Sequence, residues 1–225
     1  MQKFDTPAPV SAIIDIPAGR IRFSATDRAD TTVEVLPADA SKGRDVKAAE
    51  QTEVSYADGV LRVEIPGARN RSLGSSGSVE VTVQLPAGSR VEAKAAAAEF
   101  RGVGRLGDVT FEGGHRSVKL DEADSVRLAG LDADITVGRL NGPAEISTQK
   151  GDLTITEAAA AGTVTLSTLK GDITVGAAPG VSAALDAGTT QGRISNTLRN
   201  TGATPGLTIR ATTAHGDINA RTVTG

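Results

Sequence analysis

Apolar and polar residues alternate in short runs along most of this chain, which is the pattern of half-buried β-strands. In residues 79–85, for example, valines and a leucine alternate with Glu80, Thr82 and Gln84. Two further runs flank Ala57-Asp58-Gly59. This tripeptide predicts a hairpin, because Asp-Gly favours the tight turns that join antiparallel strands. The pattern therefore predicts an all-β chain.

A repeated motif organises the second half of the chain. It occurs at Lys150–Ile155, Lys170–Val175, Gln191–Asn196 and His215–Ala220. The glycines of the four copies lie 20, 21 and 24 residues apart, a period typical of solenoid coils. A threonine stands three residues before each glycine, and a short alternating stretch precedes it. We predict that each unit consists of a strand, a glycine turn and a second strand.

Aligning the copies predicts which side chains form the core. Strands this short cannot bury a face alone, but coils stacked roughly 4.8 Å apart would form a continuous apolar wall. The apolar residue after the turn is, in chain order, Val118, Ile135, Leu153, Ile173, Ile194 and Ile218. The same register predicts one outward polar column of Thr136, Thr154, Thr174, Ser195 and Asn219. The predicted fold class is all-β, a parallel β-solenoid or β-helix-like stack of short strands with an N-terminal β-strand cap.

The first part of the chain lacks the repeat and predicts the cap. We expect a cap region over residues 1–88 and solenoid repeats over residues 89–225, together one continuous structural domain. Alternation on both sides of Pro17-Ala18-Gly19 predicts a hairpin or a first coil. Residues 39–53 are polar and predict a surface loop with one helical turn. The alanine-rich residues 93–98 predict a strand, because the two-residue alternation continues through them despite alanine's helix propensity.

A second polar stretch, residues 68–77, has the composition of a flexible, solvated loop. It contains Arg69 and Arg71, so contact of this loop with an acidic partner is an alternative to a purely solvated loop.

Composition limits which residue types can form the core and which classes of partner the chain can bind. Aromatic residues make up 2% of the 225 residues, so the core must consist of Val, Ile, Leu and Ala, which suits a narrow solenoid. The net charge of −3 and the few aromatic residues argue against nucleic acid. Without cysteine there is no disulfide and no thiolate zinc site. Residues 1–7 lack the apolar segment of a secretory signal and no run of eighteen apolar residues occurs, so we expect a cytoplasmic chain without a membrane span.

The residues offer no convergent catalytic arrangement. His115 and His215 are most simply polar turn residues, and no nucleophile elbow, zinc-protease motif or phosphate loop occurs. The Gly-Asp pairs lack the roughly nine-residue spacing of calcium-binding repeats, and Arg193 replaces the acid in one copy. We therefore expect no cofactor, no metal and no enzymatic activity. Structural turn roles are predicted for Gly151, Asp152, Gly171, Asp172, Gly192, Gly216 and Asp217.

Three motifs carry a resemblance to a known family: Leu-Pro-Ala-Gly-Ser-Arg-Val at Leu85–Val91, Gly-Arg-Leu-Gly-Asp at Gly104–Asp108, and the recurrent Thr-x-Lys-Gly-Asp turn. The chain resembles the putative-adhesin β-strand-repeat family of unknown function, related to the toastrack domains of bacterial envelope-stress proteins. Phe4–Pro7 and Ser41–Thr52 are similar to its actinobacterial stand-alone members. The resemblance covers nearly the whole chain. It implies a β-solenoid-like fold and a non-catalytic role in assembly or interaction, with a link to a stress response.

Two functions remain open from the sequence. The first is a non-enzymatic scaffold whose exposed side or edge binds a protein partner or another copy of itself, because the repeat is not interrupted by any catalytic coil. The second is a carbohydrate-binding or carbohydrate-cleaving β-helix protein. The polar column and the acidic column of Asp134, Asp152 and Asp172 favour this alternative, because acidic grooves occur in β-helix lyases and hydrolases.

Overall fold

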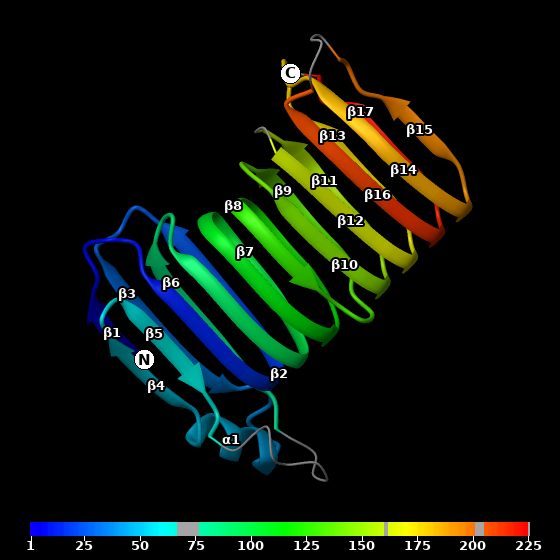
Figure 1. The fold of residues 1–225 in the computed structure, drawn as a ribbon. Helices are drawn as coiled ribbons and strands as arrows, with labels where there is room; N and C mark the ends of the chain where they lie inside the picture. Colours follow the sequence, from blue (N-terminus) through cyan, green and yellow to red (C-terminus); the bar gives the residue numbers. More distant parts are fainter. Residues whose placement is uncertain (67–76, 160–161, 201–204, 225) are drawn as a thin grey trace. The chain divides into compact units, whose positions relative to one another are not determined.

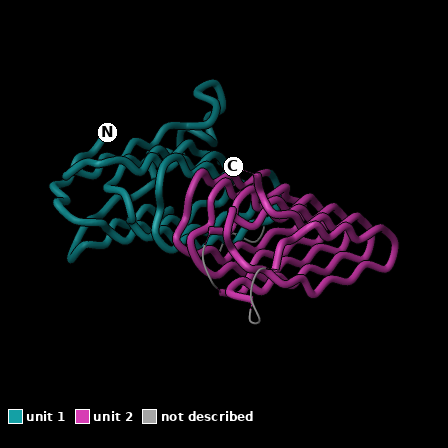
Figure 2. The backbone as a smooth tube through the Cα atoms, turned by 90° about the horizontal axis from the view of Figure 1, so that it is seen from above, with its two compact units in different colours: residues 1–116 teal, residues 117–225 magenta. Residues whose placement is uncertain are grey.

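Strands form nearly all of the regular structure in the computed structural model, which describes residues 1–66, 77–159, 162–200 and 205–224. The chain divides into two compact units, residues 1–116 (unit 1) and 117–225 (unit 2) (Figure 2). The boundary predicted after residue 88 falls inside unit 1. The loop with Arg69 and Arg71 lies outside the described residues.

Unit 1 is built around two long strands that run side by side. Its elements are β1 (Gln2–Asp5), β2 (Ser11–Thr26), β3 (Asp30–Pro37), α1 (Gly43–Glu50), β4 (Glu53–Ala57), β5 (Val60–Glu64), β6 (Val79–Pro86) and β7 (Arg90–His115). The first half of β2 pairs in parallel with β5 and the second half with β6, while β7 runs parallel to both halves. The strands β1, β3 and β4 add antiparallel pairs around this centre.

The stretch around Pro17 is a bend within one strand. Gly19 has φ +135° at this bend. The strand β2 does not reverse there, and after the bend it pairs with β6 instead of β5. The prediction of a first coil is confirmed and the hairpin alternative is wrong. The Asp58-Gly59 hairpin is confirmed, with both residues at positive φ. The strand prediction for residues 93–98 is also confirmed, because they pair with β2.

The core of unit 1 contains three phenylalanine rings. The ring centroids of Phe23 and Phe100 are 5.6 Å apart, and those of Phe100 and Phe111 are 5.1 Å apart. Outside this core, α1 is longer than the single turn that the sequence predicts. Asp45 and Ala48 lie one turn apart on its buried face, and the Asp45 carboxylate accepts the N–H of Ser78 at 2.9 Å. This hydrogen bond holds the helix against the start of β6.

Unit 2 consists of stacked coils whose strands pair in parallel in two rows, called sheets here, and the first strand of the unit belongs to both (Figure 1). Its strands are β8 (Val118–Ala129), β9 (Ile135–Leu140), β10 (Ala144–Lys150), β11 (Leu153–Ala158), β12 (Gly162–Lys170), β13 (Ile173–Ala177), β14 (Ala183–Gln191), β15 (Ile194–Thr197), β16 (Leu207–His215) and β17 (Ile218–Thr222). One sheet has the order β8-β10-β12-β16-β14, and the other has the order β8-β9-β11-β13-β17-β15. The parallel stack predicted from the repeat is therefore confirmed.

The order of the last two coils differs from the sequence order. The final coil of the chain, β16–β17, lies between β12–β13 and β14–β15, as the colours of Figure 1 show. The apolar file exists, but Ile218 stands between Ile173 and Ile194. Ile194 is 47% exposed at the end of the file, whereas its other members are at most 1% exposed.

Side-chain polarity accounts for the exchange of the two coils. The inward positions of β16–β17 are Leu207, Ile209, Ala211, Ile218 and Ala220, all at most 1% exposed. In β14–β15 the aligned positions include Ala183 in place of Leu207 and Asn196 in place of Ala220. Burying the apolar coil and leaving the more polar coil outermost removes more apolar surface from water. Terminal repeats generally need such a polar outer face.

Candidate functional site

The aspartates of the repeat form a ladder from coil to coil. The Asp134 carboxylate accepts the N–H of Asp152 at 2.9 Å, and Asp152 accepts the N–H of Asp172 at 2.8 Å. Asp172 in turn accepts the N–H of Asp217, and Asp217 accepts the N–H of Arg193, both at 2.8 Å. Each carboxylate therefore binds the neighbouring coil rather than its own turn, which gives the repeated aspartate a structural use.

The threonines before the turns connect the same coils from inside. The hydroxyl of Thr213 donates to the carbonyl of Gly171 at 3.0 Å, and that of Thr189 donates to Gly216 at 3.0 Å. Thr168 makes the equivalent contact with Gly151 at 3.3 Å.

The turn glycines stack without room for a side chain. Gly171 has φ +150°, and a Cβ atom on it would lie 2.1 Å from the carbonyl oxygen of Gly151. Glycine is the residue that adopts this conformation without steric cost. The four glycines and three aspartates predicted as turn residues thus lie at the stacked turns. The glycines allow close backbone approach, and the aspartates accept hydrogen bonds from the neighbouring coil.

Neither histidine belongs to a cluster with catalytic geometry. His215 lies in register with Lys170 and Gln191 in an exposed column, and His115 is exposed at the end of β7. In the described ranges, no group of three or more His, Cys, Asp or Glu side chains is placed to hold a metal ion. Within the same part of the chain, no helix has the length and apolar character needed to cross a membrane.

The outermost coil, β14–β15, has an open side. Among the described residues, β14 pairs only with β16 and β15 only with β17. In an inner coil the N–H groups of Gly151 and Leu153 donate to Lys170 and Asp172 of the next coil, both at 2.9 Å. In the part of the chain that the structure describes, the equivalent N–H groups of Gly192 and Ile194 have no following coil to donate to.

Arg193 ends the aspartate ladder. It occupies the turn position that aspartate holds in the inner coils, so this turn presents no carboxylate to a further coil. Its guanidinium contacts Asp217 at 3.4 Å, and its side chain is 91% exposed. The sequence showed this exception to the repeat, but it did not show that the exception marks the end of the stack.

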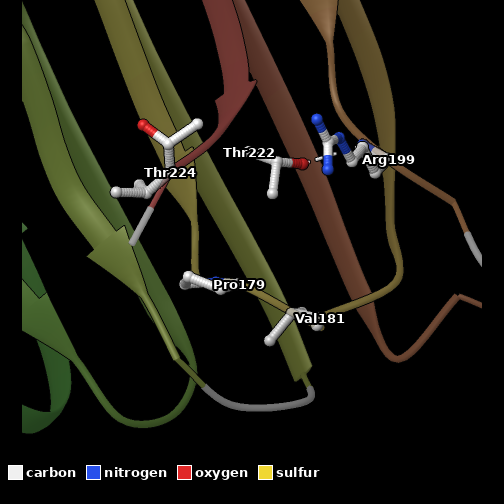
Figure 3. A pocket seen from close by; sticks show the side chains of 7 residues that line it. Pro179, Val181, Arg199, Thr222 and Thr224 are labelled. Atoms are coloured by element: carbon white, nitrogen blue, oxygen red, sulfur yellow. Dashed lines mark hydrogen bonds between the residues drawn. The ribbon is translucent and has the colours of Figure 1, made fainter.

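A pocket of about 460 Å³ lies close to the other end of β15 (Figure 3). Its lining combines apolar side chains, threonine hydroxyls and one arginine: Pro179, Gly180, Val181, Arg199, Thr222, Val223 and Thr224. The backbone N–H of Arg199 donates to the Thr222 hydroxyl at 2.8 Å. Sequence reasoning missed this pocket, because three separate segments of the chain form it: residues 179–181, residue 199 and residues 222–224.

Comparison with known proteins identifies the family. No curated protein matches the chain. Solved structures that are similar to it include a putative adhesin from Parabacteroides distasonis (17% identity, TM-score 0.48, covering 97% of this chain and 95% of that chain). A putative adhesin from Bacteroides fragilis has 15% identity and TM-score 0.45, over 97% of this chain and 95% of that chain. The family profile described as Toastrack DUF4097 matches residues 13–221. The chain belongs to the Toastrack DUF4097 family.

Proposed function

We propose that this protein is a non-enzymatic interaction scaffold that binds a protein partner through the open side of the β14–β15 coil. The observation that carries the proposal is that both strands of this coil pair on one side only within the described residues. An edge strand with unpaired N–H and C=O groups is a template for another strand.

The side chains of the coil agree with this role. Ile194 is 47% exposed, although its register partner Ile218 is buried. The strand β15 carries no charged side chain, proline or bulge that would protect an edge from pairing. The repeated aspartates, in contrast, are occupied by coil-to-coil hydrogen bonds, which supports a structural rather than a catalytic use.

A proline in the edge strand tests the proposal. In a parallel ladder the backbone groups of alternate residues point to opposite neighbours. Since Ile218 donates its N–H to the carbonyl of Arg193, the N–H of Asn196 points away from β17. We expect Asn196→Pro to keep the fold, because proline is tolerated where the N–H faces outward, and to block an added strand.

The measurement combines native co-purification with light scattering. The unmodified chain should recover an identified partner or self-associate, and Asn196→Pro should lose that interaction with an unchanged circular dichroism spectrum. Asn219→Ala, an outward change on the paired strand β17, is the control. A strict monomer without any partner, or a partner that binds Asn196→Pro equally well, contradicts the proposal.

A carbohydrate-binding face is the second candidate, and one observation favours it. Thr136, Thr154 and Thr174 lie in register on adjacent strands, and Asn219 and Ser195 continue the column. The hydroxyls therefore repeat at the strand spacing on one outward face. A glycan array with Thr154→Val as the comparison tests binding, and release of reducing sugar tests cleavage. Absence of both results removes this candidate.

A further inference from the structure

We infer that the edge of β15 binds an extended acidic segment of a partner protein, with its carboxylates placed at Arg193 and Arg199. This inference rests on the proposed function and adds the chemistry and the position of the partner. It follows from three observations on the same coil: an open backbone edge, arginines at both ends of that edge, and a pocket beside one of them.

The backbone of β15 offers pairing groups on its outer side. Ile218 donates its N–H to the carbonyl of Arg193 at 2.9 Å, so the groups of Arg193 and Ser195 point to β17. The groups of Ile194 and Asn196 therefore point outward, where the described part of the chain places no strand. An extended segment can pair with them as an added strand.

Arginines surround an otherwise uncharged strand. Arg193 precedes β15 and Arg199 follows it, six residues later. At about 3.3 Å per residue, carboxylates six residues apart on an extended segment lie roughly 20 Å from each other. Arg221, the register partner of Thr197 on β17, adds a third exposed cation.

Among the described residues, Asp217 is the carboxylate that contacts one of these guanidinium groups. Asp217 lies 3.4 Å from Arg193, and both side chains are substantially exposed, so this contact is weak. Arg199 makes its hydrogen bond to Thr222 through the backbone, and within the described ranges its guanidinium has no ion pair. The local positive charge contrasts with the net charge of −3 for the whole chain. Arginine is also the side chain best suited to carboxylate recognition, because its planar fork can bind both oxygens.

The pocket gives the Arg199 end of the edge a second recognition element. Arg199 lines the pocket together with the apolar side chains of Pro179, Val181 and Val223 (Figure 3). An apolar side chain next to the carboxylate of the partner segment can enter this space. The preferred segment therefore has an acidic residue at each end and an apolar residue beside the acid that lies at Arg199.

A synthetic peptide tests the inference on the intact chain. The probe is a fluorescent peptide of sequence Glu-Val-Thr-Val-Thr-Val-Glu, and the matched peptide carries glutamine in place of both glutamates. We expect the acidic peptide to bind about tenfold more tightly by fluorescence anisotropy, with weaker binding at high salt. Equal binding of the two peptides, or no binding of either, overturns the inference.

Charge-reversal variants locate the site. Arg193→Glu and Arg199→Glu should each weaken binding of the acidic peptide by about tenfold. Arg210→Glu is the matched control, because Arg210 is exposed in the same unit but lies on β16 in the other sheet. Amide exchange of Ile194 and Asn196 should slow when the acidic peptide is present. Equal loss in the control, or unchanged exchange at these amides, overturns the placement on β15.

The outcomes for the inference and for the proposed function can be separated. If an identified partner loses binding to Asn196→Pro but is insensitive to Arg193→Glu and Arg199→Glu, the open edge is a binding site and the acidic segment is wrong. If light scattering shows a dimer that only Asn196→Pro disrupts, the occupant is a second copy of the chain, which also overturns the acidic segment. A strict monomer without any partner removes the proposed function itself.

Discussion

Single residues in this protein act mainly by joining one coil to the next. Asp172 accepts an N–H from the following coil, Thr213 donates to a carbonyl of the preceding coil, and Gly171 lets the two backbones approach. These contacts give the recurring Thr-x-x-Gly-Asp motif a structural use. They also explain why a change to arginine at position 193 is informative, because it removes the acceptor on which a further coil would depend.

A glycine substitution tests the stacking of the turns. Gly171→Ala should lower the free energy of unfolding by about 2–4 kcal/mol, because the backbone has positive φ and the new Cβ would meet a carbonyl oxygen at 2.1 Å. Gly188→Ala in β14 is the control, since nothing lies within 4 Å of its Cβ position. This control should be neutral or slightly stabilising in urea unfolding. Equal costs for both variants would contradict the stacked turn.

Asp30 should make the stability of unit 1 sensitive to acid. Hydrogen bonds from Arg28 (2.8 Å) and Lys3 (3.0 Å) lower the pKa of its carboxyl from 3.8 to about 2. Because the folded pKa is depressed, the stabilisation is fully present above pH 3.8 and is lost as the pH falls through about 2. Between pH 3.8 and about 2, the thermal midpoint of Asp30→Asn should therefore fall less steeply than that of the unmodified chain. An equally steep loss of the thermal midpoint in Asp30→Asn and in the unmodified chain would contradict this role of Asp30.

At the level of the strands, the order of the last two coils decides which strands of unit 2 have an unpaired edge. The coil β16–β17 pairs on both sides, with β12–β13 and with β14–β15. The coil β14–β15 is consequently outermost, and the edge that we propose as a binding surface exists only in this order.

Matched core truncations test the order. Leu185 on β14 and Ile209 on β16 are register partners, but Ile209 is fully buried and Leu185 is half-buried. Ile209→Ala should cost about 2–5 kcal/mol in the free energy of unfolding, and Leu185→Ala should cost clearly less. Chemical denaturation of both variants gives the comparison. A larger cost at Leu185 would indicate that β14 lies inside the stack.

The repeat made the strands of unit 2 and their register predictable from sequence. The spacing of Gly151 and Gly171 gave the period, and the apolar residues after the turns gave the file of inward side chains. The order of the coils was not predictable from the period, because all four turns share a glycine and the same backbone groups, and several orders satisfy those groups. It depends instead on small differences such as Asn196 against Ala220. The pocket at Arg199 could not be predicted for a related reason, because no local sequence pattern indicates that Pro179 and Thr222 lie close together.

At the scale of the molecule, the division of the chain has a testable consequence. β7 runs beside both halves of β2, and Phe100 on β7 packs against Phe23 on β2. We expect the fragment 1–116 to unfold cooperatively. The fragment 1–88 lacks β7 and should show no cooperative transition, because β2 loses a neighbour along most of its length. Thermal unfolding followed by circular dichroism distinguishes the two. A folded fragment 1–88 would favour a cap that is independent of the coils.

The last coil of the sequence lies inside the stack and leaves β15 at the open end of unit 2. Pairs of cysteines measure this directly in a chain that has no natural cysteine. Thr174 and Asn219 are register partners, as are Asn219 and Ser195, so Thr174 and Ser195 are two strands, roughly 9–10 Å, apart. Disulfides need Cα atoms within about 7 Å of each other. Thr174→Cys with Asn219→Cys should form an intramolecular disulfide, and Thr174→Cys with Ser195→Cys should not. The reverse result would place β14–β15 next to β12–β13 and contradict the account.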